Sequence, residues 1–193
     1  RKGLIVFQFT LSVCFIIVIT VIFNQVNYML DKNYGFNEQD ILNVRLQGVP
    51  FDKLSVEVER IPDVLSVGGV SHRLGTWQDR SSDYQKGPGE EPFGMRDFMV
   101  DRNYVEQLGL EFVAGRNFDA TAASELERHI ILNERALSRF DFKSPMEAVS
   151  AAVYLNDSTS LEVIGVVKDF HFRPMNYEIG PLALRSNPAE FGY

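Results

Sequence analysis

The chain has 193 residues, with 19 Lys and Arg against 26 Asp and Glu, so its formal net charge is −7. This acidic balance argues against a nucleic-acid binder, which needs a basic face to displace counterions. The only cysteine, Cys14, lies in an apolar run, so the rest of the chain cannot form a disulfide framework or a thiolate metal site. The chain begins with Arg1, and we expect it to be a fragment of a longer protein.

The first segment is predicted to cross a membrane. Gly3 to Phe23 contains no charged residue, and a helix of that length spans roughly 31 Å, close to the hydrocarbon thickness of about 30 Å. A cleaved signal peptide fits poorly, because the first alanine is Ala114 and no A-x-A site follows the run. A buried core helix remains an alternative. Arg1 and Lys2 place the N-terminus in the cytoplasm by the positive-inside rule.

Four polar side chains occur inside this segment: Gln8, Thr10, Ser12 and Thr20. Polar groups at membrane depth usually face other helices, which would make this helix one member of a bundle. The hydroxyls can equally bond to their own backbone, whereas the Gln8 amide is harder to satisfy in that way.

The helical pattern can continue beyond the membrane to Gly35, a plausible C-terminal stop. We therefore predict a stalk over residues 24–34 that couples the membrane helix to the rest of the chain. Its candidate residues are Asn24, Tyr28, Asp31 and Tyr34.

The next part of the chain predicts a compact β-α-β unit. Ile41–Leu46 and Leu65–Leu74 have strand character. Between Pro50 and Pro62 the apolar residues recur at helical spacing, which predicts a helix there. Residues 75–95 are polar and rich in Gly and Pro, and they predict a long loop.

That loop has two interpretations. In the first, its aromatic residues Trp77 and Phe93 contact a substrate or partner. In the second, which we favour, the loop is a disordered connector and Trp77 folds back on the body.

The remainder alternates short strands and helices, which predicts an α+β fold. Strands are expected at 96–100, 129–132, 152–155 and 161–167. Short helices are expected after three capping signals, namely Asp101, Asn133 and the capping box that begins at Ser144.

No motif for catalysis, cofactor binding or metal binding is present in the sequence. P-loop, zinc-protease and nucleophile-elbow motifs are all absent. In the DFHFRP stretch, Asp169, His171 and Arg173 would share one face of an extended chain, with Phe170 and Phe172 on the other. A metal site would need a further ligand, so the alternative is a strand end with its aromatic residues packed inward.

Several stretches together resemble the FtsX-like ABC transporter permeases, especially the long Bacteroidetes-type forms with a MacB-type periplasmic core domain. The stretches are VFQFTLSV, NYMLDKNYGFNEQDILNV, GRNF, ILNERAL and VIGVVKDFHFRPMNYEIGPLAL.

The resemblance implies a permease subunit in the bacterial cytoplasmic (inner) membrane, with its body in the periplasm. It implies a second permease copy in a dimer, a separate cytoplasmic ATPase subunit, and a periplasmic domain that acts on a substrate or partner protein. Residues 1–35 would be membrane helix and stalk, and 36–193 the periplasmic core domain. A porter-like part (37–74 and 161–193) would carry an inserted subdomain (about 96–155). The chain would transmit ATP-driven motion and would not itself be an enzyme.

Two departures from the family affect these expectations. Ser150 stands where related sequences often have glycine, and the chain stops at Tyr193 where the family continues, so we expect an open sheet edge near the C-terminus. The alternative function is a membrane-anchored ligand-sensing domain of a signalling receptor. An anchored hydrolase is disfavoured because a nucleophile–base set is missing.

Overall fold

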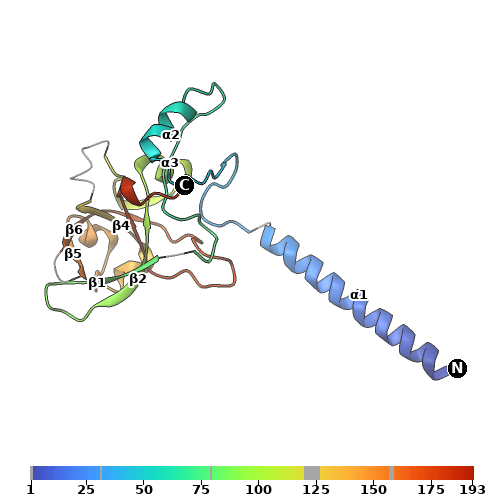
Figure 1. Cartoon of the computed structure of the whole chain (residues 1–193). Helices are drawn as coiled ribbons and strands as arrows, with labels where there is room; N and C mark the ends of the chain where they lie inside the picture. The colour runs from blue at the N-terminus through green and yellow to red at the C-terminus, as the bar shows by residue number, and fades with distance from the viewer. Residues whose placement is uncertain (1, 31, 79, 120–126, 157–158) are drawn as a thin grey trace. The chain divides into compact units, whose positions relative to one another are not determined.

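The computed structural model describes residues 2–30, 32–78, 80–119, 127–156 and 159–193. The chain divides into two compact units, 1–33 and 34–193 (Figure 1). The first unit consists of one helix, α1 (Lys2–Leu30). The predicted continuation of this helix to Gly35 is wrong: Gly35 belongs to the second unit, where it has a positive φ of 85° and lies directly against Phe170.

In the described residues of the second unit, seven strands form one mixed sheet in the order β3-β6-β4-β7-β2-β1-β5. The strands are β1 (Arg80–Gln85), β2 (Phe93–Met99), β3 (Phe112–Gly115), β4 (His129–Asn133), β5 (Ala152–Leu155), β6 (Thr159–Val167) and β7 (Leu182–Arg185).

The sheet closes on itself because β5 pairs with β6 as well as with β1. Strand β6 has nine residues, so it pairs with β5 along its first part and with β3 along its last part, while β4 pairs on its other side. Closure removes the free edges of the strands in the ring, and β3 lies outside the ring beside β6.

The helices of the second unit are short: α2 (Phe51–Val58), α3 (Arg102–Gln107), α5 (Glu134–Leu137), α6 (Pro145–Ala148) and the 3-10 helix η2 (Pro188–Glu190). Three predicted caps are confirmed, since the side chains of Asp101, Asn133 and Ser144 each accept a bond from the backbone N–H three residues later. The capping box differs in one bond, because Glu147 accepts from the N–H of Lys143 rather than from that of Ser144.

Two apolar clusters lie on opposite faces of the central strands. On β4, Ile131 belongs to one cluster, while Ile130 and Leu132 belong to the other. The same alternation holds on β7, where Ala183 faces away from its neighbours Leu182 and Leu184. Burial on both faces explains why Ile130–Leu132 and Leu182–Leu184 are uninterrupted apolar runs.

The long loop predicted over residues 75–95 is wrong, because β1 lies within it. The RSSDYQ sequence of this strand has loop-like composition, yet every second side chain makes a polar contact with one buried carboxylate, that of Asp97 on β2. Strand β1 pairs antiparallel with β2, with Arg80 opposite Asp97. The predicted strands 96–100, 129–132, 152–155 and 161–167 are confirmed as β2, β4, β5 and β6.

The predicted β-α-β unit is confirmed only in its helix, α2. Residues 41–46 and 65–74 form no ladder, although the N–H of Leu46 donates to Gly192 and that of Val70 to Tyr193. A single bridge links Val70 to Val100. Both predicted strands have the apolar content of strands, but their backbone bonds to neighbouring segments do not extend into a ladder.

The predicted open edge near the C-terminus is also wrong. The last strand, β7, pairs in parallel with β2 on one side and antiparallel with β4 on the other, so it is an interior strand. The sheet takes strands from both the suggested porter-like segments and the suggested inserted segment. The division into these two subdomains therefore stays a prediction.

Ser150 has a left-handed backbone, with φ +67°, and its N–H donates to the carbonyl of Val163 at 2.8 Å. We expect Ser150→Gly to raise stability by about 1 kcal/mol, because glycine adopts this conformation without the clash of a Cβ. The urea midpoint of the full chain in detergent, followed by near-UV circular dichroism, measures the change. Ser138→Gly, at a right-handed position, is the matched control and should give no gain.

Candidate functional site

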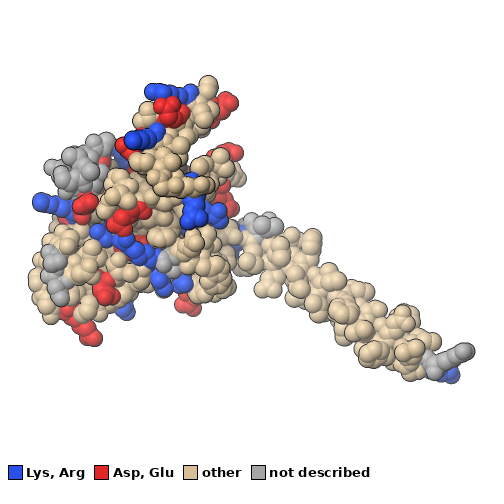
Figure 2. Space-filling model, viewed as in Figure 1, with Lys and Arg blue, Asp and Glu red and all other residues tan. Residues whose placement is uncertain are grey.

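Helix α1 has the length and composition of a membrane span. One stretch among the described residues, Lys2–Met29, is long and apolar enough to cross a bilayer, and its side chains are exposed all round. Figure 2 shows the visible surface of this helix without charged side chains between its ends, whereas the second unit carries interspersed acids and bases. A helix that is apolar on every face needs an apolar environment, which a bilayer supplies.

The hydroxyl groups of α1 bond to the helix itself. Thr10, Ser12 and Thr20 each donate to the carbonyl four residues earlier, at 2.8–2.9 Å. Of the two interpretations for the hydroxyls, backbone bonding is therefore the one observed. The role of Gln8 in contacting other helices stays a prediction.

The predicted stalk residues fall in different parts of the chain. Asn24 and Tyr28 lie in the last part of α1, and Asp31 lies outside the described residues. Tyr34 is not helical and belongs to the second unit. The helical part of the stalk is therefore shorter than predicted.

The first residues of the second unit, Tyr34–Asn37, form what we call the entry segment. The Tyr34 carbonyl accepts the N–H of His171 at 2.8 Å, and the two rings lie edge to face at 6.5 Å. Phe36 packs against the ring of buried Phe170 at 6.1 Å. Gly35 passes so close to Phe170 that an added Cβ would lie 3.0 Å from the Phe170 Cβ. Aromatic contacts thus hold this segment against the core.

A second set of bonds holds the end of the entry segment on helix α3. The N–H of Asn37 donates to the backbone carbonyl of Leu108 at 2.7 Å. The Asn37 side-chain amide donates to the backbone carbonyl of Gln107 at 3.4 Å. These carbonyls lie at the C-terminal end of the helix, where no further intrahelical donor exists. The helix is in turn capped at its start by Asp101, which accepts from Tyr104 N–H at 2.7 Å.

The Asp101 cap predicts a pH effect. Burial raises the pKa of this carboxyl above its ordinary value of 3.8, although the N–H of Tyr104 opposes the shift. Because the folded state holds the proton more tightly, stability is lost as pH rises above 3.8 through the folded pKa. Asp101→Asn keeps a capping side chain but does not titrate. Unfolding curves at successive pH values should therefore show the wild type losing stability relative to this variant; a constant difference contradicts the prediction.

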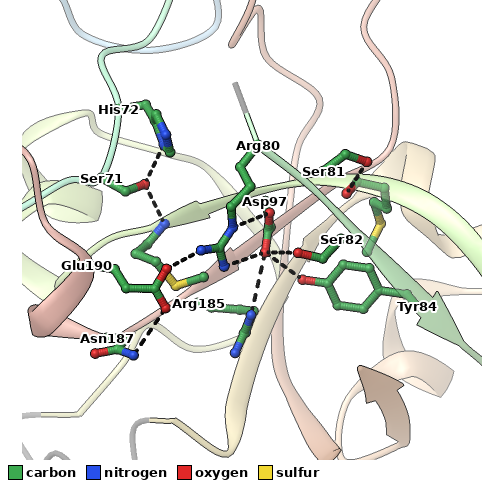
Figure 3. A network of polar contacts seen from close by, with 12 residues as sticks. Ser71, His72, Arg80, Ser81, Ser82, Tyr84, Asp97, Arg185, Asn187 and Glu190 are labelled. Atoms are coloured by element: carbon green, nitrogen blue, oxygen red, sulfur yellow. Dashed lines mark hydrogen bonds and ion pairs between the residues drawn. The ribbon is translucent and has the colours of Figure 1, made fainter. Parts of the chain in front are cut away.

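A buried network of charged groups joins the strands of the second unit (Figure 3). The Asp97 side chain is 0% exposed and accepts from Ser82 Oγ at 2.9 Å and Tyr84 Oη at 3.3 Å. It also pairs with Arg80 at 3.2 Å and with Arg185 at 3.5 Å. These residues come from β1, β2 and β7, so one carboxylate joins three strands.

The network extends to the C-terminal turn, because Arg80 also pairs with Glu190 on η2. The hydrogen bond to Asp97 raises the pKa of Arg80. Burial and the nearby charge of Asp97 both raise the pKa of Tyr84. Both shifts keep the groups in their usual protonated forms. The Asp97 carboxylate is paired with two guanidinium groups and accepts from two hydroxyl groups, so this arrangement acts as a structural clamp. The sequence prediction missed it because the partners lie far apart in the chain.

The two candidate contact residues of the sequence prediction lie in separate clusters of rings. Trp77 is 69% exposed and meets the ring of Tyr177 edge to face at 5.4 Å. Phe93 is half-buried against Phe140 at 5.0 Å, and the Arg139 guanidinium lies 4.9 Å from the centre of the Phe93 ring. Phe93 is therefore part of the packing, and only Trp77 presents most of its surface.

A groove of about 1050 Å³ lies beside α2, and sequence reasoning did not find it. Its walls are the loop before α2, the exposed side of that helix and the C-terminal residues. The lining residues include Arg45, Val49, Phe51, Val56, Pro188 and Phe191.

The DFHFRP stretch packs as the second interpretation predicted, without being a strand. Phe170 and Phe172 are buried, while Asp169 accepts from Asn133 at 2.9 Å and pairs with Arg135 at 3.1 Å. Within the described ranges, no three His, Cys, Asp or Glu side chains gather as a metal site would require.

Comparison with known proteins places these features in a family. The family model described as the MacB-like periplasmic core domain matches residues 4–183. The extracellular domain of the noncanonic ABC-type transporter YknZ from Gram-positive bacteria aligns with a TM-score of 0.51 at 15% identity, over 74% of this chain and 66% of that one.

Two further solved structures have lower scores. The periplasmic region of MacB from Actinobacillus actinomycetemcomitans aligns with a TM-score of 0.49 at 16% identity, over 78% of this chain and 68% of that one. A domain of a putative permease from Porphyromonas gingivalis aligns with a TM-score of 0.48 at 11% identity, over 69% and 55%. The chain thus spans about two thirds of the first two structures. No curated protein matches it.

Proposed function

The chain belongs to the family of ABC transporter permeases with a MacB-like periplasmic core domain, and from that premise we propose that it transmits ATP-driven motion across the bacterial cytoplasmic membrane. In this proposal α1 spans the membrane and the second unit lies in the periplasm, where it acts on a substrate or partner protein. The observation that carries the proposal is that the family match begins inside α1 and continues to residue 183, so it includes the helix together with the outer domain.

The entry segment supports the mechanical part of the proposal. Four peptide steps connect the end of α1 at Leu30 to Tyr34, where the backbone is bonded to His171 and the neighbouring rings pack on Phe170. Asn37 is bonded to the end of α3 three residues later. In this proposal a displacement of α1 is therefore passed through a short connection to the entry segment, whose backbone is bonded to the core. The proposed partners are a cytoplasmic ATPase subunit, a second permease copy and a periplasmic protein.

Disulfide crosslinking tests the proposal. Cys14 is the only cysteine, so Cys14→Ser gives a cysteine-free background into which Tyr28→Cys is placed. In membranes that contain the full permease and its ATPase, we expect the crosslinked dimer fraction at this position to change when ATP is added. The matched control is the same variant with a hydrolysis-deficient ATPase, which should give no change. An ATP-independent fraction with the active ATPase contradicts the proposal.

One observation favours the alternative, a membrane-anchored ligand-sensing domain. The groove beside α2 is a concave surface of a size that suits a small ligand, about 1050 Å³. A sensor would change its crosslinking on ligand addition without ATP, so the same experiment separates the two functions.

A further inference from the structure

One buried asparagine, Asn133, uses the whole hydrogen-bonding capacity of its side chain. The residue is 1% exposed and lies where β4 ends and α5 begins. Its Oδ1 accepts the N–H groups of Ala136 at 3.1 Å and of Leu182 at 2.8 Å. Its Nδ2 donates to Asp169 Oδ1 and to the carbonyl of Gly180, both at 2.9 Å. A side-chain amide has two donor hydrogens and two acceptor lone pairs, so all four are used.

Three of these four bonds go to the residues at the two ends of one loop. The loop comprises residues 168–181 and connects β6 to β7, and we call it the receiver loop. Asp169 lies at its start, Gly180 lies near its end, and Leu182 is the first residue of β7. One amide therefore closes the base of the receiver loop and fastens it to β4, a strand that is paired on both sides.

The start of helix α5 adds further bonds to the first end of the receiver loop. The N–H of Arg135 donates to Asp169 Oδ1 at 3.0 Å, and Glu134 accepts the N–H of Asp169 at 3.1 Å. Both the side chain and the backbone of Asp169 are thus held by the junction of β4 and α5.

The entry segment docks on the same stretch of the receiver loop. The N–H of His171 donates to the carbonyl of Tyr34 at 2.8 Å, and the Phe170 ring packs against that of Phe36 at 6.1 Å. The two receiving residues directly follow Asp169 in the chain. Their position therefore depends on how Asp169 is held.

We propose that Asn133 is the positioning residue for this docking: it holds both ends of the receiver loop and thereby keeps Phe170 and His171 in place to receive the entry segment. A displacement of the entry segment then reaches β4 and β7 through one side chain instead of stretching the loop. Aspartate lacks the two donors of this amide and alanine lacks its donors and acceptors, so neither can replace it. The inference concerns the second unit alone, and only its use in passing on motion rests on the proposed function.

Amide hydrogen exchange of the full chain in detergent, followed by NMR, tests this role. In Asn133→Ala, exchange at the His171 N–H should become faster by about tenfold or more, because the receiver loop opens locally once its buried polar groups lose their partner. The N–H of Val163, which donates to the carbonyl of Ala151 at 2.9 Å, is the internal reference and should exchange as in the wild type. Unchanged exchange at His171 overturns the inference, and so does an equal acceleration at Val163.

Asn187→Ala is the matched control variant. Asn187 also caps a short helix, since it accepts the N–H of Ala189 at 3.1 Å, and its amide donates to Glu190 at 3.2 Å. These bonds lie outside the receiver loop, so exchange at His171 should stay as in the wild type. An acceleration as large as that in Asn133→Ala overturns the inference.

Asn133→Asp gives a readout that a merely structural role would not move. The new carboxylate keeps the acceptor bonds but meets the carboxylate of Asp169, so the pair retains one proton with a pKa raised above the ordinary value of about 3.9. The Arg135 guanidinium, 3.1 Å from the Asp169 carboxylate, and Lys168 beside it in the chain oppose this shift. The Glu134 carboxylate favours it.

The retained proton restores a donor between the two side chains, so the Asp variant should recover at low pH. As the pH falls from about 7 through the raised pKa, protection of the His171 N–H should rise relative to that in Asn133→Ala. Asp101 is common to both variants, so its titration cancels from the ratio. A ratio that does not change with pH overturns the inference.

Crosslinking at Tyr28→Cys separates this inference from the proposed function. If the crosslink responds to ATP but exchange at His171 is unaffected by Asn133→Ala, the inference is wrong while the proposed function stands. If exchange changes as expected but the crosslink ignores ATP, Asn133 positions the receiver loop and the proposed transmission of motion is wrong.

Discussion

Asp97→Ala is expected to lower the stability of the second unit by about 3–5 kcal/mol, the cost typical of breaking a buried ion pair from one side. Asp97 is fully buried, and Arg185, one of its two cationic partners, is only 12% exposed. Removing the carboxylate leaves that guanidinium in the interior without its counter-charge. Ser82 and Tyr84 also lose their common acceptor.

Urea unfolding of the full chain in detergent, followed by near-UV circular dichroism, measures this loss. Glu111→Ala is the matched control, because Glu111 pairs with Lys168 at a similar distance, 3.0 Å, but its side chain is 65% exposed. An exposed pair contributes only about 0–1 kcal/mol. Equal losses in the two variants would mean that the Asp97 network does not stabilise the sheet.

Gly115→Ala is expected to cost about 2–5 kcal/mol and to weaken the pairing of β3 with β6. The residue has a φ of +72°, and an added Cβ would lie 2.2 Å from the carbonyl oxygen of Ile164 and 2.7 Å from the Cα of Gly165. The left-handed backbone contributes about 1–2 kcal/mol of this cost and the overlap with backbone contributes about 1–3 kcal/mol. Neither atom can move away without breaking the ladder.

Gly89→Ala separates the two contributions. Gly89 has a similar φ, +78°, but nothing lies within 4 Å of the position that an added Cβ would take, so only the backbone cost of about 1–2 kcal/mol is expected. Unfolding midpoints of both variants give the comparison, and amide exchange at Arg116, whose N–H donates to Ile164, reports the strand pairing. A Gly115 variant no less stable than the Gly89 variant would show that the close approach is unimportant.

Local signals predicted part of the fold well, because their causes are local. The caps at Asp101, Asn133 and Ser144 each involve a side chain and an N–H three residues away, so sequence spacing alone specifies them. Strands β4 and β6 contain the buried apolar runs Ile130–Leu132 and Val163–Val167, and both strands were predicted from sequence. For the candidate site, the same reasoning gave the span of α1 and the inward packing of Phe170, but it missed the Asp97 network and the groove.

The sequence by itself determined that the first helix is uniformly apolar and that the rest alternates strands with short capped helices. Only the tertiary structure decided that the polar segment Arg80–Gln85 is a strand, that β7 is an interior strand, and that the sheet closes through β5 and β6. The physical reason is distance along the chain. Strand β1 depends on Asp97 and, through it, on Arg185, and no short-range pattern records a partner that far away.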